Sequence, residues 1–435
     1  MSWEFETDPE FQAKLDWMDT FVRAEVEPLD ALWPREVYAR PMDPRVAAVV
    51  KPLQQRVKEE GLWACHLEPE LGGQGYGQLK LALMNEILGR THWGPMVFGT
   101  QAPDTGNAEI LAHFGTPEQK ARFLRPLLDG DIVSSFSMTE PQGGSDPAGF
   151  TTTAVKDGDH WVINGYKFFS SHAKWASFLV ALIKTAPEAG VHDAFSMFLV
   201  PIDTPGVTVE RNFGLFGEAP GAGGHGLVHY DNARVPADCL LGKEGQGFAV
   251  AQVRLGGGRV HHAMRAVGIC QRALDMMAER AISRTTRGSR LADKQAVQGY
   301  IADSWAELQQ YRLLVLRTAW KIDRYQDYSK VREDIAAVKI LAPKLIKDIV
   351  GRAIQVHGAL GITTELDLMY MYQVQFVTGF SDGPSEIHQA TLARRVLKNY
   401  QPAPGLWPAS HLPTRRAAAE AHVSKRLAEL GFQEP

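Results

Sequence analysis

The segment Phe380-Ser-Asp-Gly-Pro-Ser-Glu386 places a carboxylate where acid–base chemistry could use it. Pro384 suits the first turn of a helix, and Asp382 precedes it by two residues. The carboxylate should therefore lie near a helix N-terminus, whose partial positive charge favours the ionised form of a general base. The same pattern also suits an aspartate or serine, Asp382 or Ser381, that only caps the helix. From these residues alone both interpretations stay open.

A second segment, Met138-Thr-Glu-Pro-Gln-Gly-Gly-Ser-Asp-Pro-Ala-Gly149, combines hydroxyl side chains with glycines. In a tight loop, exposed N–H groups and hydroxyls can bind oxyanions and ring heteroatoms. A third, Gly221-Ala-Gly-Gly-His-Gly226, fits GxGxxG by letter. It leads into an expected strand, however, and a dinucleotide fingerprint must open a helix. We therefore do not interpret it as a dinucleotide-binding turn.

Histidine and cysteine spacing gives little support for a metal site. His261 and His262 are adjacent in an expected helix, so their side chains should point about 100° apart and cannot readily share one ion. His225 and His229 are more simply core or surface residues. The three cysteines lie far apart in the chain and show no CxxC or zinc spacing. We expect no metal site and a reducing compartment.

The expected elements run in the order helical, β, helical. Helical patterns cover Phe11–Val26, Lys80–Leu88, Arg259–Arg284, Ala292–Arg324, Arg332–Val356 and Ser385–Asn399. Strand patterns cover Thr151–Val155, Trp161–Ile163, Lys167–Phe169, Phe195–Val200 and Leu227–Tyr230, with turns expected at Asp157-Gly158 and Asn164-Gly165. The strands form one block and do not alternate with helices, which argues against a βαβ nucleotide-binding fold.

Length and composition limit the classes of function that the chain can have. The 435 residues allow two to four domains, and a net charge of −4 lacks the basic excess of nucleic-acid-binding proteins. No stretch approaches 18 consecutive apolar residues, and the first residues are acidic where a targeting peptide would be basic. We expect a soluble, cytoplasmic protein without a membrane span.

Five segments together resemble the acyl-CoA dehydrogenase family. The loop that begins at Met138 is similar to its T-E-P-x-x-G-S-D signature, and Ile163-Asn-Gly-Tyr-Lys-Phe-Phe-Ser-Ser171 to its I-N-G-x-K-x-W-I-T hairpin. The pair Arg284 and Gln295, the turn Gln355–Gly361 and the segment Asp382–Glu386 follow in the family's order. Within the family, Gln101–Asn107, Arg254–His262 and the Asp-Gly-Pro form of the last motif resemble the subgroup of human acyl-CoA dehydrogenase family members 10 and 11 and their bacterial relatives.

The resemblance implies the acyl-CoA dehydrogenase fold: an N-terminal α-helical domain, a middle β-barrel or sandwich domain and a C-terminal four-helix bundle. We place these domains at residues 1–132, 133–248 and 249–400, followed by a loosely held tail, 401–435, that ends in a short helix. It implies FAD as cofactor, α,β-dehydrogenation of an acyl-CoA in fatty-acid β-oxidation, electron-transfer flavoprotein as acceptor, and a homodimer or homotetramer. In that reaction a carboxylate removes a proton from Cα while a hydride leaves Cβ for flavin N5.

The resemblance also implies roles for single residues. Asp382 becomes the catalytic base, and Ser145, Gly256, Arg259 and Gly383 become substrate contacts. The implied FAD contacts are Phe136, Met138, Thr139, Gly144, Ser145, Phe169, Ser171, Arg284, Gln295, Gln355, Gly358, Pro384 and Glu386. Those at Arg284, Gln295, Gln355 and Gly358 concern the adenosine and pyrophosphate portion and are expected to reach across a subunit interface, where an arginine suits a pyrophosphate.

Several positions depart from the family pattern. Asp382 replaces the usual glutamate and has one methylene less of reach, and a misplacement of about 1 Å can cost on the order of 10²-fold in rate. Some members carry the base where this chain has Gly258, which has no side chain to take a proton. The glycines Gly256, Gly257 and Gly258 fit either a flexible helix start or room beside the acyl chain. Two alternatives therefore stay open, a flavin oxidase similar to nitroalkane oxidase and a non-catalytic acyl-CoA- or flavin-binding subunit.

Overall fold

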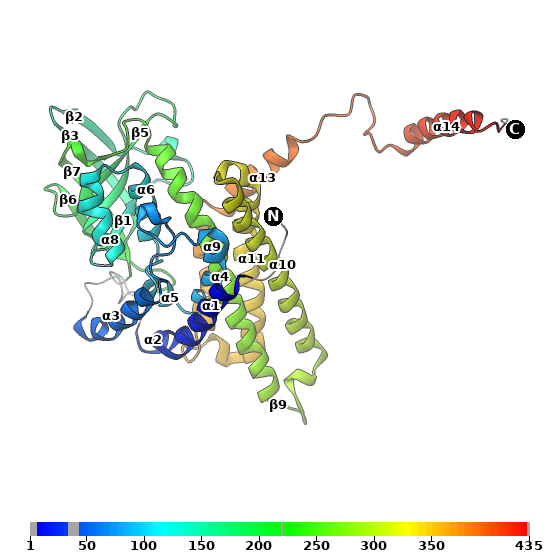
Figure 1. Ribbon diagram of the computed structural model, residues 1–435, viewed down its shortest axis with the longest axis horizontal. Helices are drawn as coiled ribbons and strands as arrows, with labels where there is room; N and C mark the ends of the chain where they lie inside the picture. Colours follow the sequence, from blue (N-terminus) through cyan, green and yellow to red (C-terminus); the bar gives the residue numbers. More distant parts are fainter. Residues whose placement is uncertain (1–6, 34–42, 219–220, 222, 433–435) are drawn as a thin grey trace. The chain divides into compact units, whose positions relative to one another are not determined.

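A computed structural model describes residues 7–33, 43–218, 221 and 223–432. The chain divides into two units, residues 1–389 and 390–435, each described here by itself. Within the first unit the strands gather in one lobe, and the long helices α9, α10 and α11 run side by side in another (Figure 1). The N-terminal helices pack against these long helices.

The N-terminal part is helical because capped apolar stripes repeat along it. In α1 (Pro9–Phe21) the Asp8 side chain accepts a hydrogen bond from the Phe11 amide, and the buried face carries Phe11 and Leu15. The helices expected at Phe11–Val26 and Lys80–Leu88 are confirmed. The further elements are a π-helical turn (Val22–Val26), α2 (Glu27–Leu32), α3 (Pro44–Glu59), α4 (Gly77–Leu88), α5 (Gly94–Val97), α6 (Asp104–Phe114), α7 (Pro117–Gln119) and α8 (Arg125–Asp129).

The middle part is a β lobe. Its strands are β1 (Ser134–Ser137), β2 (Thr153–Asp157), β3 (His160–Ser171), β4 (Phe178–Lys184), β5 (Phe195–Pro201), β6 (Val207–Phe213), β7 (His225–Pro236) and β8 (Leu240–Leu241). They pair in the order β6-β7-β3-β2-β4-β5-β8, with β1 parallel to β4. Strands β4 and β5 are buried on both faces, one against helices and the other against β3 and β7. The segment that ends at Gly226 opens β7 and no helix, as expected.

The turn expected at Asn164-Gly165 is wrong. Strand β3 runs through both residues and continues to Ser171, so the two short strands expected here are one. The register against β7 shifts between Ile163 and Gly165, which marks a β-bulge. Gly165 has φ +136°, and a Cβ atom there would lie 2.7 Å from the Thr152 backbone. The glycine that suggested a turn, Gly165, therefore lies at a bulge within a long strand.

The C-terminal part is built of long helices, α9 (Gly247–Ser283), α10 (Gln295–Tyr325), α11 (Arg332–His357), α12 (Leu368–Phe380) and α13 (Ser385–Leu397), with a small hairpin of β9 (Thr285–Thr286) and β10 (Ser289–Arg290). Helix α9 begins at Gly247, not at Arg259, so the glycine triplet lies inside it. A flexible helix start at the glycines is therefore wrong. Helix α12 was not expected, because its sequence is apolar around most of its circumference and lacks a clear 3.6-residue period.

The second unit holds the end of α13 and α14 (Leu412–Glu429). Helix α14 has 18 residues, more than the short helix expected for the tail, and contains no buried residue. Within the described ranges, no helix is both long and apolar enough to cross a membrane.

Candidate active site

The loop between α12 and α13 carries Asp382 in a fixed backbone conformation. Asp382 has φ +56° and Gly383 has φ +101°, values at which aspartate is tolerated and glycine is favoured. Arg259 Nε donates to the Asp382 carbonyl oxygen at 2.8 Å, and His388 Nε2 contacts the same oxygen at 3.3 Å. Buried Lys339 on α11 donates to the carbonyl oxygen of Thr378 at the end of α12. Side chains from three helices thus hold the backbone of this loop.

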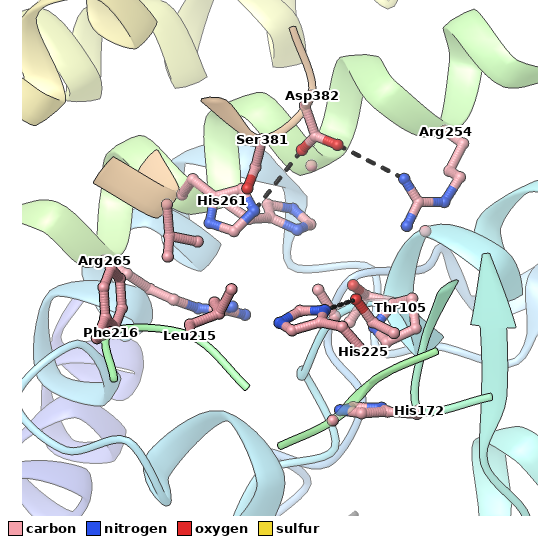
Figure 2. Close-up of a pocket in the computed structure, with 18 of the residues that line it drawn as sticks. Thr105, His172, Leu215, Phe216, His225, Arg254, His261, Arg265, Ser381 and Asp382 are labelled. Atoms are coloured by element: carbon pink, nitrogen blue, oxygen red, sulfur yellow. Dashed lines mark hydrogen bonds and ion pairs between the residues drawn. The ribbon is translucent and has the colours of Figure 1, made fainter. Parts of the chain in front are cut away.

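The Asp382 carboxylate is directed toward two side chains of α9. Arg254 Nη1 lies 3.6 Å from Oδ1, and His262 Nε2 lies 3.6 Å from Oδ2 (Figure 2). The Asp382 and Arg254 side chains are 13% and 9% exposed. The carboxylate therefore faces nitrogen groups of another helix at the wall of a cavity, a geometry that serves acid–base chemistry better than capping of α13.

Each glycine of the triplet on α9 makes room for another side chain of the same chain. A Cβ atom at Gly256 would lie 3.4 Å from the Tyr328 ring, and one at Gly257 would lie 2.7 Å from Glu109 Oε2. A Cβ atom at Gly258 would lie 2.8 Å from Asp382 Oδ2. The space that a side chain at Gly258 would need is thus occupied by the Asp382 carboxylate.

Arg254 is buried in a socket made by the N-terminal helices and β1. Its Nε donates to Asn107 Oδ1 at 3.1 Å, and its guanidinium lies 3.8 Å from the centre of the Phe136 ring. A Cβ atom at Gly106 would lie 2.8 Å from Arg254 Cγ. Burial lowers the pKa of Arg254, while Asp382, Glu109 and Asp104 act in the opposite direction. The socket holds a positive charge beside the candidate base.

Two acidic groups near Arg254 differ from ordinary surface carboxyls. Burial raises the pKa of Glu109 to about 8, against the opposing effect of Arg254, and Tyr328 Oη donates to Glu109 Oε1 at 3.5 Å. Burial likewise raises the pKa of Asp104 to about 6, although Asp104 accepts hydrogen bonds from Ser134 N at 2.8 Å and Ser134 Oγ at 2.6 Å. Glu109 therefore favours its protonated form at neutral pH, and the acidic residues that line the cavity are Glu218 and Asp382.

The cavity beside Asp382 has a volume of about 210 Å³ and lies between the helical and β lobes. Asp382 and Arg254 lie on one side, and His225 and His172 lie on the other (Figure 2). On the β side, Ser171 Oγ and His225 Nδ1 are hydrogen-bonded at 2.9 Å. The lining also includes Thr105, Phe216, His261, Arg265, Tyr370 and Ser381. Of the residues expected at the site, the structure brings Asp382 and Ser171 together here, and Gly258 lines the same cavity.

The expected flavin contacts of the β lobe present a polar loop and an aromatic ring. Ser145 and Gly144 are exposed, and a Cβ atom at Gly144 would lie 3.1 Å from Thr139 Oγ1, so the loop folds closely over Thr139. The Phe169 ring is 47% exposed at φ +55° and lies 6.1 Å from the His225 ring, which lines the cavity. An open aromatic ring and nearby hydroxyls suit a planar heterocycle such as a flavin.

Two residues of the same motifs have a structural role that the motifs did not reveal. Glu140 Oε1 and Lys167 Nζ form an ion pair at 2.8 Å, and their side chains are 1% and 0% exposed. The amides of Thr151 and Thr152 also donate to the Glu140 carboxylate, and Lys167 Nζ donates to the Met138 carbonyl oxygen. Although burial acts to raise the pKa of Glu140, Lys167 and these donors hold it at about 2. The pair ties the polar loop to strand β3.

The remaining expected contacts lie elsewhere. Arg284 follows the last residue of α9, and a Cβ atom at Gly358 would lie 4.0 Å from its Nη1. Gln295 and Gln355 are exposed, like Arg284 and Gly358. From Gly258 to Arg284 are 26 residues, which at about 1.5 Å each separate the two positions by roughly 39 Å along α9. This group therefore lies far from the Asp382 cavity of the same chain.

Four further expected contacts have these places in the structure. Pro384 is half-buried, and Glu386 is exposed in the first turn of α13. Gly256 is buried against Tyr328, so a side chain of this chain fills the space beside it and the expected substrate contact there is wrong. Met138 is half-buried after β1, where its carbonyl oxygen accepts from Lys167.

Sequence reasoning did not assign a role to Arg254, His262 or Glu109. Arg254 and His262 lie at the two ends of a segment that had been noted only for its likeness to a subgroup. Their spacing of eight residues places both on the side of α9 that carries Gly258, and this helical period was the available signal. Glu109 and Lys167 had no signal of this kind, because their partners lie far away in the chain. Across the described residues, no three His, Cys, Asp or Glu side chains gather as a metal site would need.

Comparison with known proteins agrees with this geometry. The acyl-CoA dehydrogenase N-terminal, middle and C-terminal domain families match residues 8–131, 135–226 and 245–397. The "Probable acyl-CoA dehydrogenase FadE2" of Mycobacterium tuberculosis is 43% identical over 82% of this chain and 88% of its own length. Acyl-CoA dehydrogenase family member 11 of Rattus norvegicus is 39% identical over 81% of this chain, which spans 45% of that longer protein. The crystal structure of acyl-CoA dehydrogenase from Geobacillus kaustophilus superposes with a TM-score of 0.76 at 25% identity, covering 91% of this chain and all of that one. With its three-domain arrangement of helices, sheet and helices, the chain belongs to the acyl-CoA dehydrogenase family.

Proposed function

We propose that this protein catalyses the FAD-dependent α,β-dehydrogenation of an acyl-CoA thioester to the trans-2-enoyl-CoA, with Asp382 as the base that removes the α-proton. The observation that carries the proposal is the Asp382 carboxylate at the cavity wall, between Arg254 and His262. The base acts on the Cα proton, and the chemistry that FAD supplies when bound is acceptance of the hydride from Cβ. The carboxylate ends the step protonated, and the enoyl product is neutral at Cα and Cβ.

Arg254 places a positive charge beside the base. An acyl chain that enters the cavity displaces water, and a carboxylate in a dry apolar pocket takes up a proton and loses its function as a base. A guanidinium 3.6 Å away opposes this effect because it stabilises the charged form. The distance is longer than a direct hydrogen bond, so the carboxylate oxygen remains available to a proton. Arg254 is thus a positioning residue that acts through Asp382.

The missing methylene of Asp382 is compensated by the position of its loop. Arg259, His388 and Lys339 hold the loop backbone, and the bare Cα of Gly258 lets the carboxylate approach α9 closely. A rigidly held short side chain can reach its substrate when the backbone itself is brought forward. The expected contacts of Ser145, Arg259 and Gly383 with substrate stay predictions.

The chain's own residues fit FAD in two groups. Phe169, Ser171, Thr139, Gly144 and Ser145 offer an open aromatic ring, hydroxyls and a glycine loop beside the cavity, as a flavin ring needs. Exposed Arg284, with Gly358 at φ +67° beside it, offers a cation and close backbone approach, as a pyrophosphate needs. Because roughly 39 Å of α9 separates Gly258 from Arg284, the second group would serve the FAD of a neighbouring subunit, which supports a homodimer or homotetramer.

An anaerobic titration tests the proposal. The purified protein, loaded with FAD, receives a panel of acyl-CoAs of different length and branching while the flavin absorbance is recorded. Bleaching of the flavin band with a long-wavelength charge-transfer band is the expected result. If dithionite bleaches the flavin but no thioester does, the dehydrogenase proposal is refuted. Rapid reoxidation of the reduced flavin by oxygen would indicate an oxidase, and slow reoxidation with transfer to electron-transfer flavoprotein would indicate the expected acceptor.

A further inference from the structure

A second cavity adjoins the one beside Asp382. It has a volume of about 150 Å³ and shares five lining residues with the first cavity: Ala102, His262, Arg265, Tyr370 and Val377. We call these five residues the neck and the second cavity the tail chamber. The five residues line both spaces, so the tail chamber is the space next to the cavity toward which a chain extending past Asp382 would lead.

The tail chamber is built between single faces of two helices. On α9 its lining residues, His262, Arg265, Ile269 and Arg272, follow a spacing of three or four residues. On α12 the lining residues Tyr370, Met371, Val374, Val377 and Thr378 follow the same period. Both faces lead away from the base, because Gly258 precedes His262 on α9 and Asp382 follows Thr378 after α12. The end of α4 and the start of α5 close the chamber with Leu88, Pro95 and Met96.

Two of the three arginines on the chamber wall form ion pairs within the chain, and the third, Arg265, donates to Asn85 Oδ1 at 2.9 Å. Arg90 pairs with Glu27 at 2.9 Å and with Asp275 at 2.8 Å. Arg272 pairs with Asp30 and Asp367, each at 2.9 Å. An anionic ligand would have to compete with four carboxylates for these two arginines, and Asp367 itself lines the chamber. A neutral apolar tail instead meets Leu88, Met96, Ile269, Met371 and Val374 without breaking an ion pair.

Helix geometry gives the length of chain that reaches the chamber. From Gly258, which touches the base, to the neck residues His262 and Arg265 is roughly 6 to 10 Å along α9. With C–C bonds of about 1.5 Å, an extended alkyl chain advances roughly 1.3 Å per carbon, so chains of up to about 8 carbons end at the neck. A cavity of about 150 Å³ is large enough to hold benzene, with its six carbons. The two spaces together therefore fit a chain of about 14 carbons.

We propose that the tail chamber binds the distal part of a straight, uncharged acyl chain and makes acyl-CoAs of roughly 12 to 16 carbons the preferred substrates. The inference rests on the proposed function, because the chamber matters only if an acyl-CoA lies beside Asp382. It names the chain-length class that this site selects. Each buried methylene strengthens binding, and part of that gain is offset by ordering the chain.

A tryptophan at Ile269 tests the proposal. Ile269 is half-buried and faces the chamber from α9, so Ile269→Trp fills the space. Ile282→Trp is the matched control, since Ile282 lies on the same helix and is 60% exposed. Val374→Phe fills the chamber from α12 and provides a second variant if Ile269→Trp folds poorly. Flavin reduction is measured under anaerobic conditions with unbranched acyl-CoAs of about 4 to about 18 carbons, and FAD content is measured for every variant.

The expected wild-type rate constant at limiting substrate is at least about 10-fold higher for a chain of about 14 carbons than for one of about 6. Ile269→Trp or Val374→Phe should remove this preference and change the rate with the short chain less than about threefold, and Ile282→Trp should keep the wild-type profile. Turnover of short chains without a gain at about 14 carbons refutes the tail chamber alone. An equal loss at all lengths in both chamber variants refutes it as well. Failure at every length in the wild type refutes the proposed function instead.

Discussion

Two buried ion pairs in this molecule are built in opposite ways. Glu140 and Lys167, in the β lobe, meet at 2.8 Å with almost no exposure, and both are surrounded by further hydrogen bonds. Asp382 and Arg254, at the cavity, stand 3.6 Å apart, and a third group, His262, approaches the other carboxylate oxygen. In the first pair the hydrogen-bonding positions of the carboxylate are occupied, whereas in the second pair a carboxylate oxygen can still accept a proton.

The difference separates a structural carboxylate, Glu140, from the proposed base, Asp382. A saturated pair ties two chain segments together. A loose pair stabilises the charge but lets an incoming group displace or protonate it. Burial and opposite charge are common to both, so distance and the number of donors distinguish them.

The largest effect is expected from a substitution that removes the carboxylate of the Asp382–Arg254 pair. Asp382→Asn removes the proton acceptor but keeps a residue that tolerates φ near +56°, so the loop should hold its shape. Flavin reduction by acyl-CoA should fall by on the order of 10³-fold, as expected for loss of a general base. Stopped-flow absorbance under anaerobic conditions measures the rate, with FAD content and acyl-CoA binding measured alongside. Unchanged turnover would mean that another group is the base.

Breaking the structural pair should affect stability and not chemistry. Lys167→Met leaves the Glu140 carboxylate buried without its partner, which should lower the free energy of unfolding by about 3 to 5 kcal/mol. Urea denaturation monitored by circular dichroism measures the change. Lys156→Met, on the neighbouring exposed face of β2, is the control and should stay within about 0.5 kcal/mol of wild type. Equal effects in both variants would contradict a special role for the pair.

From the Glu140–Lys167 pair we also expect the stability of the protein to decrease at acidic pH. The pKa of Glu140 is held at about 2 in the folded protein, below the roughly 4.3 of an unfolded chain. Its contribution is therefore complete above about pH 4.3, decreases as the pH falls toward about 2, and amounts to about 3 kcal/mol. The difference in unfolding free energy between wild type and Glu140→Gln, measured from pH 7 downward, should shrink over this window. A difference that stays constant with pH would show that Glu140 is not ionised when folded.

A smaller effect is expected when the reactive pair loses its cation. Arg254→Met keeps an unbranched apolar stem in the socket but removes the charge 3.6 Å from Asp382. The carboxylate should lose the opposite charge that stabilises it, so flavin reduction should fall by about 10- to 100-fold near neutral pH. Stopped-flow absorbance under anaerobic conditions measures the loss, and Arg254→Lys should restore part of the wild-type rate. An equal loss in Arg254→Lys would point to packing in the socket and not to charge.

The smallest expected effect perturbs only the geometry of the reactive pair. In Gly258→Ala the new Cβ atom would lie 2.8 Å from Asp382 Oδ2, so the carboxylate must move and the rate should fall by about 10-fold. Stability should stay equal or rise by up to about 1 kcal/mol, because alanine favours a helix more than glycine does. Gly299→Ala is the control, since Gly299 on α10 has open space around it and should show the stability gain without the rate loss. Rates equal to wild type in both variants would contradict the close approach.

Much of the fold could be predicted from local patterns, and much of the site could not. The order of helices, strands and helices followed from hydrophobic period, and the family motifs pointed to Asp382. The bulge at Gly165 and helix α12 were missed, because glycine signals both turns and bulges and because α12 has no polar face in its sequence. The partners of Asp382 could not be predicted from local pattern, since Arg254 lies 128 residues before it (382 minus 254). Contacts at such distances in sequence depend on the tertiary fold.

Helix α9 carries both the neighbours of the base and, at its far end, Arg284. A continuous helix fixes both the distance and the angle between such positions. Insertion of a single residue between Gly258 and Arg284 would shift Arg284 by about 1.5 Å and turn it by about 100°. Natural variation in this stretch should therefore consist of substitutions, whereas changes of length should be confined to the hairpin that follows it.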